Sequence, residues 1–190
     1  MQTLVKTVLE TQFLEQEANA DAKHEYHNGE VVSMAGATEE HNLIVSNLLG
    51  ELYLCLKGKG CKIYPSDMLT KLAQCKKYVY SDIMLVCETA QIERKTEKSA
   101  DVLLNPNIVV EVLSESTAFY EKTEKKRCYQ MLPSLEQYVM IDSTQIEVTS
   151  YKRTPENDWI LEVLKDLPDH LQIGECTIKL ADMYAQIQWR

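Results

Sequence analysis

One segment in the middle of the chain constrains the fold most, because it reads as a strand, a helix and a second strand. Ile108–Leu113 is a continuous apolar, β-branched run, which is typical of a strand covered on both faces. A helix from Ser116 or Thr117 to about Leu132 follows, and Tyr138–Asp142 is the next strand. The pattern predicts two parallel strands joined by a right-handed crossover.

The remaining segments complete a mixed sheet flanked by helices. Asn28-Gly29 predicts a tight hairpin turn between two short strands, and Thr38 begins a long helix with apolar residues at period 3.6. We therefore expect an α/β or α+β fold in one domain, residues 1–190, with a helical segment at 1–20 and an extension at 154–190. The other predicted elements are a helix over 8–18, strands at Cys61–Tyr64, Met68–Leu72, Tyr78–Cys87, Gln145–Lys152 and Trp159–Leu164, and a short helix over 179–186.

Composition limits where the chain works and what it binds. The longest apolar runs are far shorter than the roughly 20 residues that cross a bilayer, and no signal peptide is visible, so we expect a cytoplasmic protein. The 6 cysteines include no CxxC pair, which favours small buried thiols in a reducing compartment over a zinc site. A net charge of -9 opposes a general nucleic-acid coat protein, but not an enzyme that gathers carboxylates around a metal.

Two acidic residues interrupt apolar strands. Asp82 lies near the start of a predicted strand, and Glu111 lies near the end of Ile108–Leu113. A carboxylate buried alone is costly, so each needs a metal, a cation or a proton. If the two strands are neighbours, the carboxylates converge and, with a backbone carbonyl and waters, suit Mg²⁺ or Mn²⁺. An ordinary edge position or a salt bridge is the alternative for each residue taken singly.

Lys125 lies on the apolar face of the predicted helix. Its neighbours at helical spacing are Cys128, Tyr129 and Leu132, so its side chain is expected to point inward, over the end of the strand that carries Glu111. A lysine at this place can orient or deprotonate a water, or hold a phosphate oxygen. The alternative is a lysine that snorkels to the surface.

Several motifs together resemble the Uma2 family of restriction-endonuclease-like proteins, which is abundant in cyanobacteria and lies within the PD-(D/E)XK nuclease superfamily. The resemblance covers roughly residues 20–153. It is carried by residues 110–117, 120–129 and 132–142, with shorter matches at 25–30, His41, 65–67 and 80–82.

The resemblance implies roles for the three central residues. Asp82 matches the aspartate of the PD element, although Ser81 replaces the usual proline, and Glu111 matches the acid of (D/E)XK. The lysine expected two residues later is Leu113 here, and the family's lysine on the following helix matches Lys125. Asp82 and Glu111, with the carbonyl of Val112, are then expected to bind one or two Mg²⁺ or Mn²⁺ ions.

The resemblance also suggests roles for residues outside this central set. Glu30 resembles an acid that can join the metal, His41 matches a family histidine or is a helix-capping residue, and Asp67 is an outer ligand or only a turn residue. Three basic residues could contact phosphates or could form an ordinary solvated surface: Lys122, Lys126 and Arg127.

The resemblance thus implies a metal-dependent endonuclease that hydrolyses phosphodiester bonds in DNA and works as a homodimer. Replacing Lys125 by Ala is expected to abolish cleavage and to spare the fold. Two other functions stay open, because fold likeness does not settle function. One is a catalytically silent interaction protein on a nuclease scaffold, and the other is a hydrolase of another phosphoester.

Overall fold

The computed structural model describes residues 7–34, 36–115 and 118–189. The predicted helix caps, Ser116 and Thr117, lie outside these residues. No helix in the described part is long and apolar enough to cross a membrane. The helices and helical turns are α1 (Glu10–Glu17), α2 (Glu39–Leu56), η1 (Ala73–Cys75), α3 (Ala118–Tyr120), the π-helical turn η2 (Glu121–Lys125), α4 (Lys126–Gln130) and α5 (Leu180–Met183).

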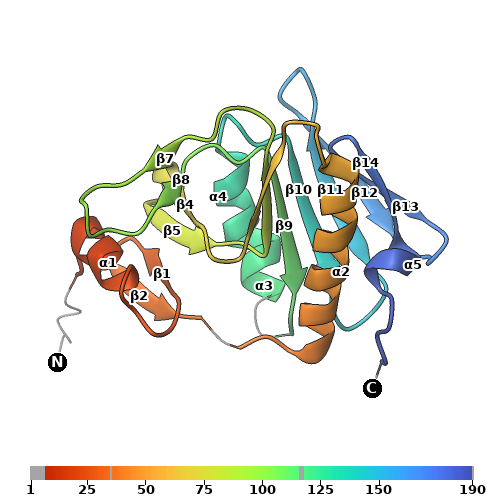
Figure 1. The fold of residues 1–190 in the computed structure, drawn as a ribbon, viewed down its shortest axis with the longest axis horizontal. Helices are drawn as coiled ribbons and strands as arrows, with labels where there is room; N and C mark the ends of the chain where they lie inside the picture. Colours follow the sequence, from red (N-terminus) through yellow and green to blue (C-terminus); the bar gives the residue numbers. More distant parts are fainter. Residues whose placement is uncertain (1–6, 35, 116–117, 190) are drawn as a thin grey trace.

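The predicted α+β class is confirmed, with two large sheets in place of a single central one (Figure 1). The central sheet has the strand order β12-β11-β10-β9-β6-β3, and the N-terminal sheet has the order β2-β1-β5-β4-β8-β7. In the central sheet the strands are β3 (Lys62–Pro65), β6 (Ile83–Val86), β9 (Ile108–Leu113), β10 (Gln137–Asp142), β11 (Val148–Arg153) and β12 (Trp159–Leu164).

The N-terminal sheet lies at the left of Figure 1 and includes the predicted hairpin. Its turn is at Asn28 and Gly29, whose φ angles of 49° and 104° suit this turn sequence. The strands are β1 (His24–His27), β2 (Glu30–Ser33), β4 (Leu69–Leu72), β5 (Lys77–Tyr80), β7 (Ile92–Glu93) and β8 (Val102–Leu103). A separate hairpin of β13 (His170–Ile173) and β14 (Cys176–Lys179), which the sequence did not predict, lies near the C-terminus.

The strand–helix–strand prediction is confirmed, because β9 and β10 pair in parallel with Glu111 opposite Met140. Antiparallel to β9 on its other side runs β6. Side chains along β9 alternate between the two faces of the sheet. Val110 and Val112 pack with α2, whereas Val109 and Leu113 pack with α4. Glu111 therefore points to the face covered by the helical segment that follows β9.

The predicted strand Tyr78–Cys87 is wrong as a single element. It is interrupted at Ser81 and Asp82, where the chain leaves the N-terminal sheet as β5 and enters the central sheet as β6. The apolar run hides the interruption, because residues on both sides of it are buried strand residues. At the point where the chain crosses between the sheets, the carboxylate of Asp82 accepts a hydrogen bond from the backbone N–H of Val112 on β9.

The six cysteines form three disulfides, so the prediction of unpaired thiols is wrong. Residues far apart in sequence are joined: Cys55 to Cys176, Cys61 to Cys87, and Cys75 to Cys128. Because Cys128 lies on α4, the last bridge ties the helical segment after β9 to η1. The spacing of the cysteines gave no sign of this pairing, because the pairing depends on the tertiary fold.

Candidate active site

The strand that follows Asp82 and the strand that contains Glu111 are antiparallel neighbours, which is the condition that the sequence left open. Asp82 directly precedes β6, and β6 pairs with β9. The Oδ2 atom of Asp82 lies 2.7 Å from the N atom of Val112, the residue after Glu111. The side chain of Asp82 is 17% exposed, whereas that of Glu111 is 2% exposed. Asp82 therefore forms the open side of the site and Glu111 its buried side.

Lys125 points inward, as its helical spacing predicted, and lies among three carboxylates. Its Nζ atom is 3.0 Å from Oε1 of Glu111, 3.5 Å from Oε1 of Glu25 and 3.9 Å from Oε1 of Glu121. It also donates a 2.7 Å hydrogen bond to the carbonyl of Tyr80. The predicted helix forms as α3, η2 and α4, and both Glu121 and Lys125 of the wide turn η2 are buried. Such π-helical turns occur often at functional sites.

The charges of this cluster shift one another's protonation. Burial opposes the charged form of Lys125, but Glu111, Glu25 and Glu121 outweigh it, so the pKa of Lys125 lies well above its usual value. Burial raises the pKa of Glu111 well above its usual value, and the charge of Lys125 only partly opposes this. These shifts favour the charged ammonium form of Lys125, which acts as a hydrogen-bond donor.

Glu25 is a member of the cluster that sequence reasoning missed. It is buried on β1, and its Oε1 atom accepts a 3.3 Å hydrogen bond from the N–H of Tyr80. His27 lies 2.9 Å from its other oxygen. Burial opposes its ionisation, but Lys125 and His27 outweigh burial and lower the pKa of Glu25. The ionised carboxylate of Glu25 thus holds Lys125 from the N-terminal sheet.

A chain of polar contacts leads outward from Glu25. His27 Nε2 lies 3.2 Å from the hydroxyl of Tyr120, which accepts a 3.1 Å hydrogen bond from Lys77. Lys77 also pairs with Glu124 at 3.1 Å. These contacts join the N-terminal sheet to the helical segment that carries Lys125, so they fix the position of the lysine relative to the strand acids.

His41 reaches the site from the first turn of α2. Thr38 caps this helix, as predicted, by accepting a hydrogen bond from the N–H of His41. The Nε2 atom of His41 lies 3.3 Å from Oδ2 of Asp82. Burial lowers the pKa of His41, but Asp82 outweighs burial and the net pKa is raised. The histidine thus adds a second contact to the open side of the site.

The structure leaves two predicted supporting acids outside the cluster. Glu30 is exposed at the start of β2, the edge strand of the N-terminal sheet, and lies opposite His27. Asp67 is 82% exposed in its side chain and pairs with Lys23. Glu25 takes the place predicted for Glu30, because β1 is an inner strand between β2 and β5.

The three basic residues predicted to contact phosphate have different surroundings. The Nζ atom of Lys126 lies 4.2 Å from the centre of the Tyr151 ring, so its ammonium group makes a cation–π contact within the protein. Arg127 is exposed, and Lys122 is half-buried on η2. Lys122 and Arg127 thus remain the better placed of the three for an external anion.

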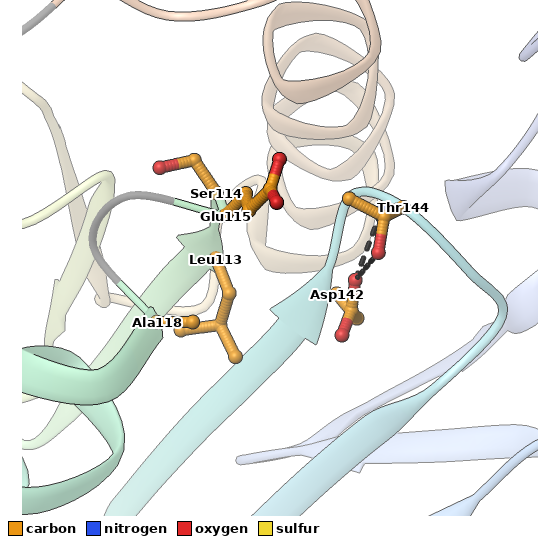
Figure 2. A pocket seen from close by; sticks show the side chains of 6 residues that line it. All are labelled: Leu113, Ser114, Glu115, Ala118, Asp142 and Thr144. Carbon is orange, nitrogen blue, oxygen red and sulfur yellow. Dashed lines mark hydrogen bonds between the residues drawn. The ribbon is translucent and has the colours of Figure 1, made fainter. Parts of the chain in front are cut away.

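A pocket of about 470 Å³ opens beyond the ends of β9 and β10. It is lined by Leu113, Ser114, Glu115, Ala118, Asp142 and Thr144. Figure 2 shows Leu113 and Asp142 at the ends of the two neighbouring strands, with the hydroxyl of Thr144 bonded to Asp142. Asp82, Glu111 and Lys125 do not line this pocket, although it begins two residues beyond Glu111 on the same strand.

The donor atoms fit a hard divalent cation as a partial ligand set. The Oε1 atom of Glu111 is buried, and in the described residues its partner is the Lys125 ammonium, with which it forms an ion pair at 3.0 Å. Within that same part of the chain, no three His, Cys, Asp or Glu side chains gather into a complete metal cage. Mg²⁺ commonly takes one or two carboxylates and completes its shell with water and substrate phosphates, and the number and type of acids at Asp82 and Glu111 match this requirement.

The two mixed sheets and their flanking helices form a nuclease-like class of fold. A crystal structure of "a putative nuclease belonging to DUF820 from Anabaena variabilis ATCC 29413" matches it with a TM-score of 0.69 at 16% identity. The match covers 87% of this chain and 92% of that one. At this identity the likeness concerns the fold alone.

Sequence comparison identifies the family. The family model "Uma2: Putative restriction endonuclease" matches residues 11–181. Two proteins of Synechocystis sp. (strain ATCC 27184 / PCC 6803 / Kazusa) are also similar. "Uncharacterized protein sll1609" is 31% identical over 159 residues, covering 84% of this chain and 88% of its own, and "Uncharacterized protein slr1290" is 30% identical over 150 residues, covering 79% and 76%. The chain belongs to the Uma2 family, and family and fold together indicate a nuclease.

Proposed function

We propose that the protein is a metal-dependent endonuclease that hydrolyses phosphodiester bonds in DNA. The observation behind this proposal is that Asp82, just before β6, lies against the strand β9 that carries Glu111, whose Oε1 atom is 3.0 Å from the Lys125 ammonium. Paired carboxylates and a buried cation at one point of a sheet are costly for the fold, so a chemical use explains them better than stability does.

Asp82, Glu111 and the main chain at Val112 would hold one or two Mg²⁺ or Mn²⁺ ions. A bound ion of this kind supplies a nucleophile by lowering the pKa of its water, and it neutralises charge on the phosphate. The backbone N–H of Val112 and the ring of His41 both contact the carboxylate of Asp82. These two contacts would hold the carboxylate in one orientation when a metal ion binds. The buried Oε1 of Glu111 has a lone pair to offer.

Lys125 would align the attacking water or stabilise the negative charge that develops on the phosphate. Its raised pKa favours these donor roles over that of a base. The substrate would approach from the side of Asp82 and His41, which are the more exposed members of the site. Lys122 and Arg127 would contact flanking phosphates, and the positive charge would thus act locally on a chain of net charge -9.

The likeness to restriction-type nucleases supports DNA as the substrate and a homodimer as the working form.

We also infer a cytoplasmic location, which the redox state of the six cysteines can test. Protein taken from cells into an alkylating quench should show free thiols at Cys55, Cys61 or Cys75 if the compartment is reducing. Fully bridged protein would contradict that location.

Cleavage of supercoiled plasmid tests the function. Wild type, Asp82→Asn and the control Asp67→Asn are purified side by side and assayed with Mg²⁺ or Mn²⁺, with and without EDTA. Wild type and Asp67→Asn should cut only with metal, and Asp82→Asn should not cut. Equal cleavage by all three proteins would mean a contaminant and would refute the assignment.

A catalytically silent interaction protein is the second candidate. It is favoured by the position of Lys125, which already compensates three carboxylates. A thermal shift on adding Mn²⁺, lost in Glu111→Gln, would support the enzyme. No shift in either protein would support the silent scaffold. Cleavage of a small phosphodiester without cleavage of DNA would instead indicate another phosphoester substrate.

A further inference from the structure

The β12 strand leaves one edge of the central sheet unpaired among the described residues (Figure 1). It is the longest edge strand of the two large sheets, with 6 residues against 4 in β3, 4 in β2 and 2 in β7. The opposite edge, β3, contains Lys62 and Pro65, which are residues that discourage pairing. The sequence of β12, Trp-Ile-Leu-Glu-Val-Leu, has a single charge and no proline.

Apolar side chains are exposed on both faces of β12. Ile160 is 61% exposed on one face, and Leu161 and Val163 are 55% and 46% exposed on the other. The alternation of a strand separates these residues, so burying them needs a partner that continues the sheet rather than one that covers a face.

The hydrogen bonds of β11 show which residues of β12 point their backbone N–H and carbonyl groups away from β11, toward the open edge. The N–H of Thr154 donates to the carbonyl of Asp158, whereas the N–H of Arg153 donates away from β12, to Glu136. Arg153 faces Trp159 in the register of β11 and β12, so Trp159 points its N–H and carbonyl outward. Alternation gives the same outward direction at Leu161 and Val163, and no backbone partner of theirs on that side is found in the described chain.

We propose that β12 pairs antiparallel with β12 of a second copy of this chain, so that two central sheets join into one. A two-fold axis through an antiparallel pair requires one residue to face itself. Centring the axis on Leu161 sets Trp159 opposite Val163 of the second copy and uses all three outward-facing residues.

Charge favours this register. Centred on Leu161, the pair sets Glu162 opposite the apolar Ile160 of the second copy. A shift of one residue would set Glu162 against its own counterpart, and like charges directly opposite each other destabilise a sheet. The interface lies three strands away from β9, so it stands apart from the proposed chemistry and leaves each site within one copy.

Sedimentation of the full chain over a concentration series tests the proposal. Wild type should dimerise, and Leu161→Lys, which sets a charge against its own copy, should weaken dimerisation by at least about tenfold. Leu54→Lys is the matched control, because Leu54 is 71% exposed on α2, and it should dimerise as wild type does. A wild type that stays monomeric, or a dimer that survives Leu161→Lys, would overturn the interface.

A cross-linking experiment decides the register, and it serves alone if Leu161→Lys fails to fold. Facing Cα atoms in a hydrogen-bonded antiparallel pair lie about 5.5 Å apart, which a disulfide can span. Leu161→Cys should therefore form a covalent dimer on mild oxidation, and Ile160→Cys, two residues out of register with its own copy, should not. In protein oxidised to its three disulfides, the native cysteines supply no competing thiol. A failure of Leu161→Cys to link, or equal linking by both variants, would refute the pairing.

Discussion

Replacing Lys125 by Met should destabilise the protein severely, contrary to the expectation that its removal spares the fold. The lysine is 3% exposed in its side chain and lies within 4 Å of Glu111, Glu25 and Glu121. At an effective dielectric constant near 20, the 3.0 Å pair with Glu111 alone corresponds to about 5.5 kcal/mol of Coulomb attraction. Desolvation offsets much of this attraction in the wild type.

The loss on mutation is larger than the net value of the ion pairs, because the carboxylates stay buried when the ammonium is removed. Breaking a buried pair from one side costs about 3–5 kcal/mol. Adding Glu111→Gln to Lys125→Met removes one uncompensated carboxylate, so the double variant should recover about 1–3 kcal/mol. Lys126→Met, the control one residue along, removes only a contact with the Tyr151 ring and should cost about 1 kcal/mol or less.

Urea unfolding of the four proteins at neutral pH measures these differences. If Lys125→Met lost no more stability than Lys126→Met, or if Glu111→Gln destabilised the Lys125→Met background further, Lys125 would not be the cation that compensates the buried carboxylates. Activity of Lys125→Met has meaning only where the fraction folded is known, so cleavage assays on it should be corrected for that fraction.

Three further changes test other contacts. Tyr129→Phe should cost about 1–3 kcal/mol in urea unfolding, since it leaves the buried Ser81 hydroxyl without its 2.6 Å partner; no loss would mean that this contact is dispensable. Cys75→Ser with Cys128→Ser should lower the free energy of unfolding by about 4 kcal/mol on a chain-entropy basis, given a separation of 53 residues, and an unchanged melting temperature would argue against that bridge in solution. The hydrogen bond from Lys95 lowers the pKa of Glu10, so its contribution is present above about pH 4.5 and lost as the pH falls; Glu10→Gln should flatten the acid limb of the stability profile, and an unchanged limb would contradict this.

The part of the site that lies close in sequence was predictable. Glu111 is marked by a charge within an apolar strand, and Lys125 by its place on the inward face of the helix that follows. Both signals depend only on local periodicity and on the short crossover from β9 to β10. Lys125 points inward as predicted, although the π-helical turn η2 changes the residue spacing on which that prediction was based.

Glu25 and the second sheet were not predictable in the same way. A hairpin pattern shows that β1 and β2 pair, but it does not tell which of them borders β5. That choice depends on a long-range contact, and it decides whether Glu25 or Glu30 is buried. The crossing between the sheets at Asp82 and the pairing of the cysteines also depend on tertiary contacts. No local sequence pattern indicates either of them.

Metal-dependent plasmid cleavage by wild type, Glu111→Gln and Glu30→Gln, purified in parallel, tests whether the acid beside Lys125 is needed for catalysis. Both substitutions remove one carboxylate, but only Glu111 lies beside Lys125, whereas Glu30 is exposed on an edge strand. We expect wild type and Glu30→Gln to cut at similar rates and Glu111→Gln not to cut. Cleavage by Glu111→Gln at the wild-type rate would contradict this expectation.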